Sequence, residues 1–284
     1  MMTSHDQGHG GHEGHGAAQP GGLLVSEHGY TLELDTPILS SGTQTVTFRV
    51  TGPDGQAVTD FELTHEKELH FIAIRRDTMG FQHVHPVMDP SGTWSTDLDV
   101  TPGVWRFFAD FDPAGHGQPM TLGIDASVAG EYDPQPLPAI TRTTEVGDYT
   151  VTLKGSLSSG EASELTFSVQ RNGKPVIDLQ PYLGAYGHLV ALRDGDLAYL
   201  HVHPEGEPGD GRTVPGPEIA FIAAAPSMGS YRLHLDFQHE DIVRTAQFTV
   251  SAGGSVHGSG HQNGHNPVPP AEEPAHHGGH GHHA

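Results

Sequence analysis

The strongest constraint on the fold is an internal repeat. The segments HFIAIRRDTMGFQHVHP (70–86) and HLVALRDGDLAYLHVHP (188–204) each carry three histidines at the same spacing, with 118 residues between the pairs His70/His188, His83/His201 and His85/His203. Farther on, GVWRFFADF (103–111) matches GSYRLHLDF (229–237) at an offset of 126. The extra residues of the second copy fall in a Gly/Pro-rich loop, where insertions cost little. A period this long indicates duplication of a whole domain rather than a solenoid.

Each copy consists of short segments with alternating apolar and polar residues. Examples are YTLEL and TVTFRV in the first copy and YTVTL and ELTFSV in the second, separated by turn signals such as PDG and RNG. No segment has a sustained helical period, so the pattern predicts an all-β protein with two tandem antiparallel sandwiches, Ig-like or cupredoxin-like. The predicted organisation is a His/Gly-rich tail (1–22), a first sandwich (23–130), a Pro-rich linker (131–144), a second sandwich (145–252) and a disordered His/Gly/Pro-rich tail (253–284).

Composition excludes several classes of protein. The formal net charge of −22 repels phosphate backbones and anionic lipids, which argues against nucleic-acid and membrane-surface binding. Because the 284 residues include no cysteine, thiolate metal sites, disulfides and cysteine nucleophiles are absent. The sequence has no run of 18 apolar residues, so no membrane-spanning helix is expected. Metal ions are the expected partners, for the reasons given by the histidines below. No protein partner is indicated.

The histidines of each copy fall on a predicted β-hairpin. Asp194-Gly195 is a strong two-residue turn signal, which predicts that His188 lies directly opposite His201 with His203 on the same face. The first copy lacks this signal, so the convergence of His70, His83 and His85 is inferred by analogy. Imidazoles that start this close can bind one Zn²⁺ at about 2.0–2.1 Å. The sequence therefore predicts one three-histidine metal site in each domain.

The neighbours of the histidines indicate which face of the sheet they occupy. Ile72 and Ile74 accompany His70, whereas Arg75 and Gln82 fall on the other face. This alternation predicts that the histidines lie on the inner face of each sandwich, near its mouth. Asp110 and Asp236 occupy matching positions that count to the outer face, which predicts a structural or solvent-exposed role.

Additional ligands are predicted less specifically. The candidates for a fourth ligand are His116 in the first domain and His239 in the second, with water as an equal alternative. Flexible Gly-His tails chelate copper, zinc or nickel loosely. The tail histidines predicted to do so are His5, His9, His12, His15, His276, His277, His280, His282 and His283.

All-imidazole ligation suits Zn, Cu(II) and Ni, and a blue-copper site needs a cysteine. We therefore expect copper(II), with zinc close behind, in a protein that sequesters, buffers or delivers the ion and is not an enzyme. With histidines near their ordinary pKa, binding would weaken below roughly pH 6.

Four segments resemble a family of mostly uncharacterised actinobacterial proteins described as exported or heavy-metal-binding. These are HFIAIRRDTMGFQHVHP, GVWRFFADFDPAG, HLVALRDGDLAYLHVHP and YRLHLDFQHEDIVRTAQFTV, and the resemblance extends over roughly residues 25–250. It implies heavy-metal homeostasis, most often of copper, in an extracytoplasmic setting. The first 22 residues contain no basic start and no apolar segment, so as written they are not a secretory signal and a cytoplasmic location is the alternative.

Two other classes remain open on the sequence. Copper-zinc superoxide dismutase also places a His-x-His on a sandwich strand, which keeps a copper-dependent redox enzyme as an alternative. Its histidine-rich zinc loop has no counterpart here, because no histidine lies between His85 and His116. A β-sandwich adhesion or scaffold module that binds no metal is the third class.

Overall fold

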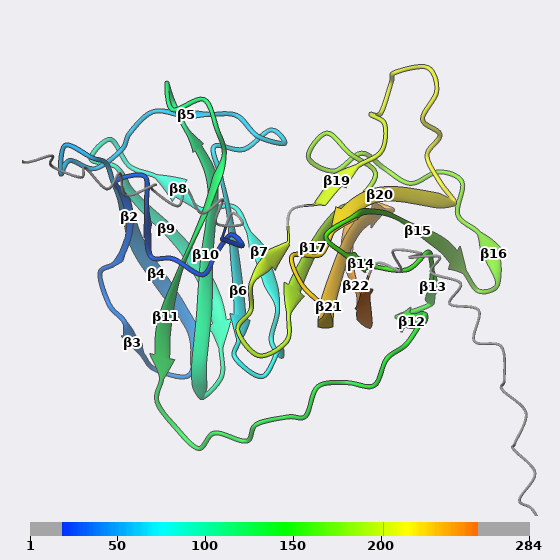
Figure 1. Ribbon diagram of the computed structural model, residues 1–284, viewed down its shortest axis with the longest axis horizontal. Coiled ribbons are helices and arrows are strands. Elements are labelled where there is room, and N and C mark those ends of the chain that lie inside the picture. Colours follow the sequence, from blue (N-terminus) through cyan, green and yellow to red (C-terminus); the bar gives the residue numbers. More distant parts are fainter. Residues whose placement is uncertain (1–18, 201, 255–284) are drawn as a thin grey trace, which may run out of the picture.

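Two β-sandwiches lie side by side in the computed structural model, which describes residues 19–200 and 202–254 (Figure 1). The described residues are entirely strands, turns and connecting segments, and each repeat contributes two packed sheets. The predicted all-β architecture with tandem sandwiches is thus confirmed. Residues 1–18 and 255–284, which make up most of the two predicted His-rich tails, lie outside the described part of the chain, whereas β22 continues to Gly254.

The first repeat contains eleven strands. They are β1 (Ser26–Glu27), β2 (Tyr30–Leu34), β3 (Ile38–Leu39), β4 (Gly42–Thr51), β5 (Phe61–Glu62), β6 (Leu69–Arg75), β7 (Gln82–Val84), β8 (Val87–Met88), β9 (Thr93–Val100), β10 (Gly103–Pro113) and β11 (Met120–Val128). One sheet has the order β1-β2-β4-β9-β8 and the other β3-β11-β10-β6-β7, with β5 paired to β10.

The second repeat builds the same pair of sheets. Its strands are β12 (Thr143–Val146), β13 (Tyr149–Lys154), β14 (Ser158–Ser159), β15 (Ala162–Arg171), β16 (Lys174–Pro175), β17 (His188–Arg193), β18 (Tyr199–Leu200), β19 (Val202–Pro204), β20 (Glu218–Ala224), β21 (Gly229–His239) and β22 (Ile242–Gly254). One sheet has the order β12-β13-β15-β20-β19, with β16 paired to β15, and the other β14-β22-β21-β17-β18.

Alternation along the strands builds the two sandwich cores. In β4, Val46, Phe48 and Val50 are buried in the first core, whereas their neighbours are partly exposed. The same pattern in β15 buries every second residue in the second core. Period-two hydrophobicity therefore determines which face of each outer sheet points inward.

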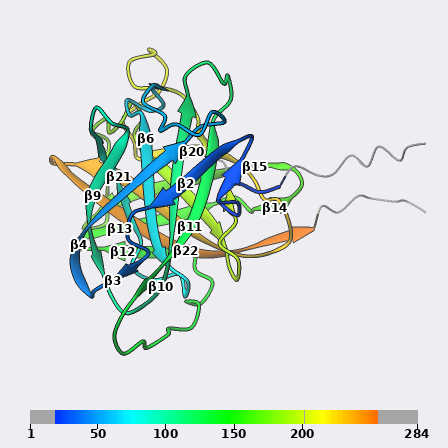
Figure 2. The same cartoon turned by 90° about the vertical axis from the view of Figure 1, so that its left-hand side faces the viewer.

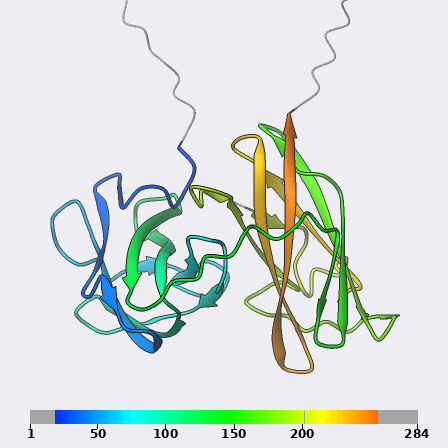
Figure 3. The same cartoon turned by 90° about the horizontal axis from the view of Figure 1, so that it is seen from below.

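A third apolar cluster joins the two repeats, and we call it the domain interface. Its buried members are Ile72, Ile74, Phe108, Val190, Leu192 and Leu197, with Phe81 and Tyr199 packed against them. The outer sheet of the first repeat, with β2, β4 and β9, faces the viewer in Figure 2, and the sheet behind it meets the second repeat. Seen from below, the segment between β11 and β12 crosses from one sandwich to the other (Figure 3).

In each repeat the chain changes sheets directly at the His-x-His motif. β7 pairs with β6, and the next strand, β8, pairs with β9 in the other sheet. Likewise β18 pairs with β17, but β19 pairs with β20. The predicted hairpin continued through His203, whereas the structure has two short strands, β18 and β19, in different sheets. The motif therefore lies where the chain passes from one sheet of the sandwich to the other.

Candidate metal centre

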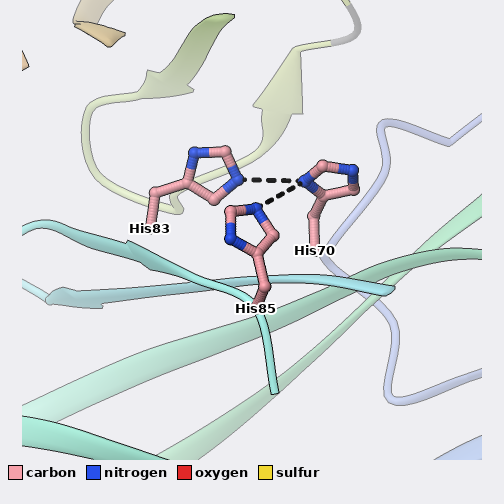
Figure 4. Close-up of side chains that lie close together, drawn as sticks. All are labelled: His70, His83 and His85. Carbon is pink, nitrogen blue, oxygen red and sulfur yellow. Dashed lines mark hydrogen bonds between the residues drawn. The ribbon is translucent and has the colours of Figure 1, made fainter. Parts of the chain in front are cut away.

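Three imidazoles of the first repeat meet at one point. His70 lies on β6, His83 on β7 and His85 directly after β7, and their rings point toward one another (Figure 4). Nδ1 of His70 lies 3.1 Å from Nε2 of His83 and 3.2 Å from Nε2 of His85. One ligand atom from each residue lies within 4.8 Å of the others, and among the described residues this is the only such group of three His, Asp or Glu. We call these residues the triad; they form a group that could hold a metal ion.

The strand register that produces the triad differs from the predicted one. β6 and β7 pair Ile72 with His83 and Phe71 with Val84, so the same register continued by one residue places His85, not His83, opposite His70. His83 reaches His70 diagonally along the same face. Diagonal neighbours are close enough for long side chains to meet, so the triad forms despite the shifted register.

The turn in the second repeat explains the corresponding error there. Ala191 pairs with Leu200, and Arg193 N donates to Ala198 O, so Asp194-Gly195 is part of a four-residue loop rather than a two-residue turn. This register, seen at the pairs Ala191/Leu200 and Leu192/Tyr199, differs from the predicted one that placed position 201 opposite His188. Leu197 adopts a φ of 60° and is buried in the domain interface, so apolar burial between the repeats outweighs the local turn preference.

The backbone and a carboxylate fix the tautomers of two triad members. Nε2 of His70 lies 2.9 Å from the carbonyl oxygen of Thr64, which can only accept, so Nε2 carries the hydrogen and Nδ1 has a lone pair. Nδ1 of His83 lies 2.9 Å from Oδ2 of Asp236, which leaves Nε2 of His83 unprotonated in the neutral ring. When both rings are neutral, two lone pairs face each other, a repulsive arrangement unless a cation lies between them.

Burial disfavours protonation of two triad members, His70 and His85. Burial, reinforced by the neighbouring imidazoles, lowers the pKa of His70 to about 3, although the Thr64 carbonyl opposes the shift. Burial likewise lowers the pKa of His85 to about 4. These rings are therefore neutral at pH 7, the form that binds metals. The sequence-based assumption of ordinary pKa values does not hold for these two residues, and protons compete with a metal for them only at lower pH.

The triad lies on the outer face of its sandwich, not on the inner face that the sequence predicted. Ile72 and Ile74, which share the face of His70, pack in the domain interface, whereas Phe71 and Ala73 point into the sandwich core. Alternation could not distinguish these faces because β6 is buried on both. The second repeat covers the triad.

Asp236 contacts the triad, which the sequence did not predict. It belongs to the second repeat, contacts His83 of the first, and also accepts a hydrogen bond from Thr245 Oγ1 at 2.6 Å. His83 and Asp236 are each only 5% exposed at the side chain. The residue does point away from its own sandwich, as predicted, but that direction leads into the domain interface. Asp236 lies directly opposite His188, just as Asp110 lies directly opposite His70. An aspartate at the same position of both repeats, next to a histidine, was the signal that could have revealed this contact.

The predicted second site falls partly outside the described residues. His188 is buried, and its ring centroid lies 6.4 Å from those of both His70 and His83. His201 is not among the described residues, and of His203 only the backbone is described. His188, on β17 of the second repeat, therefore lies beside the triad at the domain interface.

The two candidates for a fourth ligand lie elsewhere. The ring of His116 packs against those of His28 and Tyr30, outside the triad. Both ring nitrogens of His239 are already engaged, with Tyr149 Oη at 2.7 Å and Asp178 Oδ1 at 3.1 Å. The structure therefore does not support a role for either residue as the fourth ligand. The tail histidines lie beyond the described ranges.

Replacing Asp236 with asparagine is expected to weaken metal binding by about 10-fold or more, because partners that hydrogen-bond to a ligating histidine orient the ring and raise its basicity. Competition against a chromophoric chelator measures the change. Asp178→Asn is the matched control, since it removes the same charge from a carboxylate that is 78% exposed. Equal affinities of the two variants would contradict a supporting role for Asp236.

The sequence profile of DUF8832, a domain of unknown function, matches residues 25–129 and 144–254. The chain belongs to the DUF8832 family. The two matched segments correspond to the two sandwiches, so each repeat is one copy of this domain. No curated protein matches the chain.

Solved structures share only general β architecture with the DUF8832 chain. A DUF4426 family protein from Pseudomonas aeruginosa is 10% identical with a TM-score of 0.28, covering 39% of this chain and 96% of that one. InvD from Yersinia pseudotuberculosis is 14% identical with a TM-score of 0.26, covering 81% and 59%. The D00-D0 domain of intimin is 11% identical with a TM-score of 0.24, covering 78% and 99%. Similarity at this level carries no argument about function. The described residues contain no helix suited to crossing a membrane.

Proposed function

We propose that this protein binds a divalent transition-metal ion through Nδ1 of His70, Nε2 of His83 and Nε2 of His85. The observation that carries the proposal is the meeting of unprotonated nitrogens at 3.1 Å, with the opposite nitrogens of His70 and His83 occupied by Thr64 and Asp236. A single proton between two rings would leave the third ring nitrogen without a partner. A metal ion at the centre satisfies all three.

The spacing of the nitrogens supports this assignment. Tetrahedral nitrogens at metal distances of about 2.0–2.1 Å are about 3.3–3.4 Å apart. The measured separations of 3.1 and 3.2 Å differ from that value by only a few tenths of an ångström. For these two pairs only small ring rotations are needed to accept the ion, and the ligand atoms of His83 and His85 lie within 4.8 Å of each other. Hydrogen bonds from ligating histidines to a carbonyl and a carboxylate are the usual outer support of such sites.

The proposed ion is copper(II), with zinc as the alternative, because imidazole ligands suit both. The proposed role is sequestration, buffering or delivery in heavy-metal homeostasis, so the metal is cargo and no reaction is assigned to it. The formal net charge of −22 favours the approach of cations. An extracytoplasmic setting is part of the proposal and is supported by the resemblance to actinobacterial heavy-metal-binding proteins.

Titration of the full chain with copper(II) and with zinc in the presence of a competing chelator tests this function. We expect a tight phase that survives the chelator, in addition to weaker uptake by the His-rich tails. In the copper titration, electron paramagnetic resonance of the tight phase should show hyperfine coupling to several imidazole nitrogens. Absence of a tight phase with either metal would refute the proposal.

A further inference from the structure

A cavity of about 300 Å³ lies beside the triad, at the domain interface. Its lining comes from both repeats and includes His65, His70 and His83 of the first and His188 of the second. His65 and His188 are imidazoles that the triad does not use. The cavity therefore brings together metal-binding side chains outside the site already described.

His65 occupies an unusual backbone position. It lies with Glu66 in the tight turn between Thr64 and Lys67, and both central residues have positive φ values, 49° and 63°. Such turns favour asparagine and glycine, so a histidine followed by a glutamate costs backbone energy. The corresponding turn of the second repeat has Leu183 and Gly184. The histidine is thus peculiar to the first repeat and is not explained by the duplication.

His188 presents one defined nitrogen for binding. Its Nε2 lies 2.8 Å from the carbonyl oxygen of Tyr182, so Nε2 carries the hydrogen and Nδ1 holds a lone pair in the neutral ring. His70 is held in the same way by Thr64 and uses Nδ1 toward the triad. His188 is only 8% exposed, so its ring orientation is fixed by packing.

The rings of His65 and His188 are as close to each other as the rings within the triad. Their ring centroids are 5.1 Å apart. Within the triad the centroid separations are 5.0, 5.0 and 5.4 Å. By contrast, His188 is 6.4 Å from His70, and His65 is 6.1 Å from His70. Each of these two residues is therefore closer to the other than to His70.

The cavity also carries negative charge that suits a cation. Asp110 and Asp112 line it, and Oδ1 of Asp112 is buried with no hydrogen-bond partner among the described residues. A cation in the cavity would compensate for a buried carboxylate oxygen that otherwise costs free energy.

We propose that His65 and His188 bind a second transition-metal ion in this cavity, next to the triad and across the two repeats. This second site depends on the proposed function in one respect: the protein must take up transition-metal ions. Two protein ligands with water in the remaining positions hold an ion more weakly than three, so the second ion binds after the triad is filled.

Zinc binding to the full chain by equilibrium dialysis, over a range of buffered free zinc concentrations, tests this site. The variants are His65→Leu, His188→Leu and the double variant. Leucine is chosen because Leu183 occupies the corresponding turn at a φ of 52°, so His65→Leu keeps a side chain that this backbone tolerates. His28→Leu is the matched control, since His28 also has a φ of 49° but a side chain that is 62% exposed. Uptake by the tails is common to all variants and cancels in the differences.

We expect each single variant to bind one zinc ion fewer than the wild-type protein, and the double variant to lose the same single ion. His28→Leu should alter uptake by less than one ion and only at high free zinc. Superposition of the His65→Leu and wild-type isotherms would overturn the proposal, as would loss of two separate ions in the double variant. Failure of the proposed function gives a different result from failure of this second site. If the triad binds no metal, His85→Ala leaves the tightest phase unchanged.

Discussion

Replacing His85 with alanine is expected to weaken the tight metal-binding phase by at least about 100-fold, because loss of a ligand costs more than the 10–100-fold typical of its outer partners. His85 is the best residue for this test. Its Nε2 faces His70, and the residue lies at the end of β7 with its side chain only partly buried, so alanine leaves a small gap. The measurement is competition with a chelator of known affinity.

The control for this prediction is His116→Ala, which removes an imidazole that packs against His28 and Tyr30. The two variants carry equal losses in histidine number, so uptake by the tails affects both equally. If the triad binds the ion, His85→Ala should lose the tight phase and His116→Ala should keep it. If both variants retained it, the ion would be bound elsewhere in the chain.

The metal-free protein is expected to lose stability steadily as the pH falls from 6.5 toward 4. Burial lowers the pKa of His70 to about 3 and those of His85 and His188 to about 4, whereas 6.5 is the ordinary value in the unfolded chain. Below pH 6.5 the unfolded chain therefore takes up protons that the folded chain does not. Each such group lowers the free energy of unfolding by about 1.4 kcal/mol per pH unit, and all three together by about 4 kcal/mol per pH unit near pH 5.

Urea unfolding of the metal-free protein at several pH values measures this slope. His188→Gln should reduce it by about 1.4 kcal/mol per pH unit, because one of the three groups no longer titrates. Nearby charges contribute to the shifts as well. His65 and His83 add to the lowering of the pKa of His188, and Asp236 opposes it. A free energy of unfolding that stayed constant between pH 6.5 and 5 would contradict neutral burial of these rings.

Metal binding should extend the stable range to lower pH. A bound ion needs unprotonated imidazoles, so it stabilises the same neutral forms that burial already favours. Because the pKa values of His70 and His85 are about 3 and 4, proton competition at these ligands begins well below the pH 6 expected for ordinary histidines. Burial thus makes these two ligands less sensitive to mild acid.

Much of this architecture could be predicted from local patterns. The period-two alternation in segments such as TVTFRV and ELTFSV specifies strands with one buried face, and the 118-residue offset specifies two equivalent domains. The spacing of His70, His83 and His85 also identified three residues that the structure brings together. A His-x-His on one strand keeps its two rings on one face under any register, so a shift in pairing moved the partners without destroying the cluster.

The register itself could not be obtained from the turn. Asp194-Gly195 favours a two-residue hairpin on its own, but the burial of Leu197 between the repeats selects a longer loop. A local turn preference amounts to little compared with burying a leucine side chain, which contributes about 1.5–3 kcal/mol. The residues around Leu197 in the sequence do not indicate that the first repeat will pack against it.

The sequence by itself determined that this protein is a duplicated all-β chain and which three histidines of the first repeat form a group, because strand periodicity and motif spacing are local properties. Only the tertiary structure decided that this group lies between the repeats, with Asp236 of the second repeat orienting His83 of the first. β6 is apolar on both faces, so its sequence cannot say which face meets the core and which meets another domain. Contact between segments about 150 residues apart depends on how two finished sandwiches pack, and no short-range pattern encodes it.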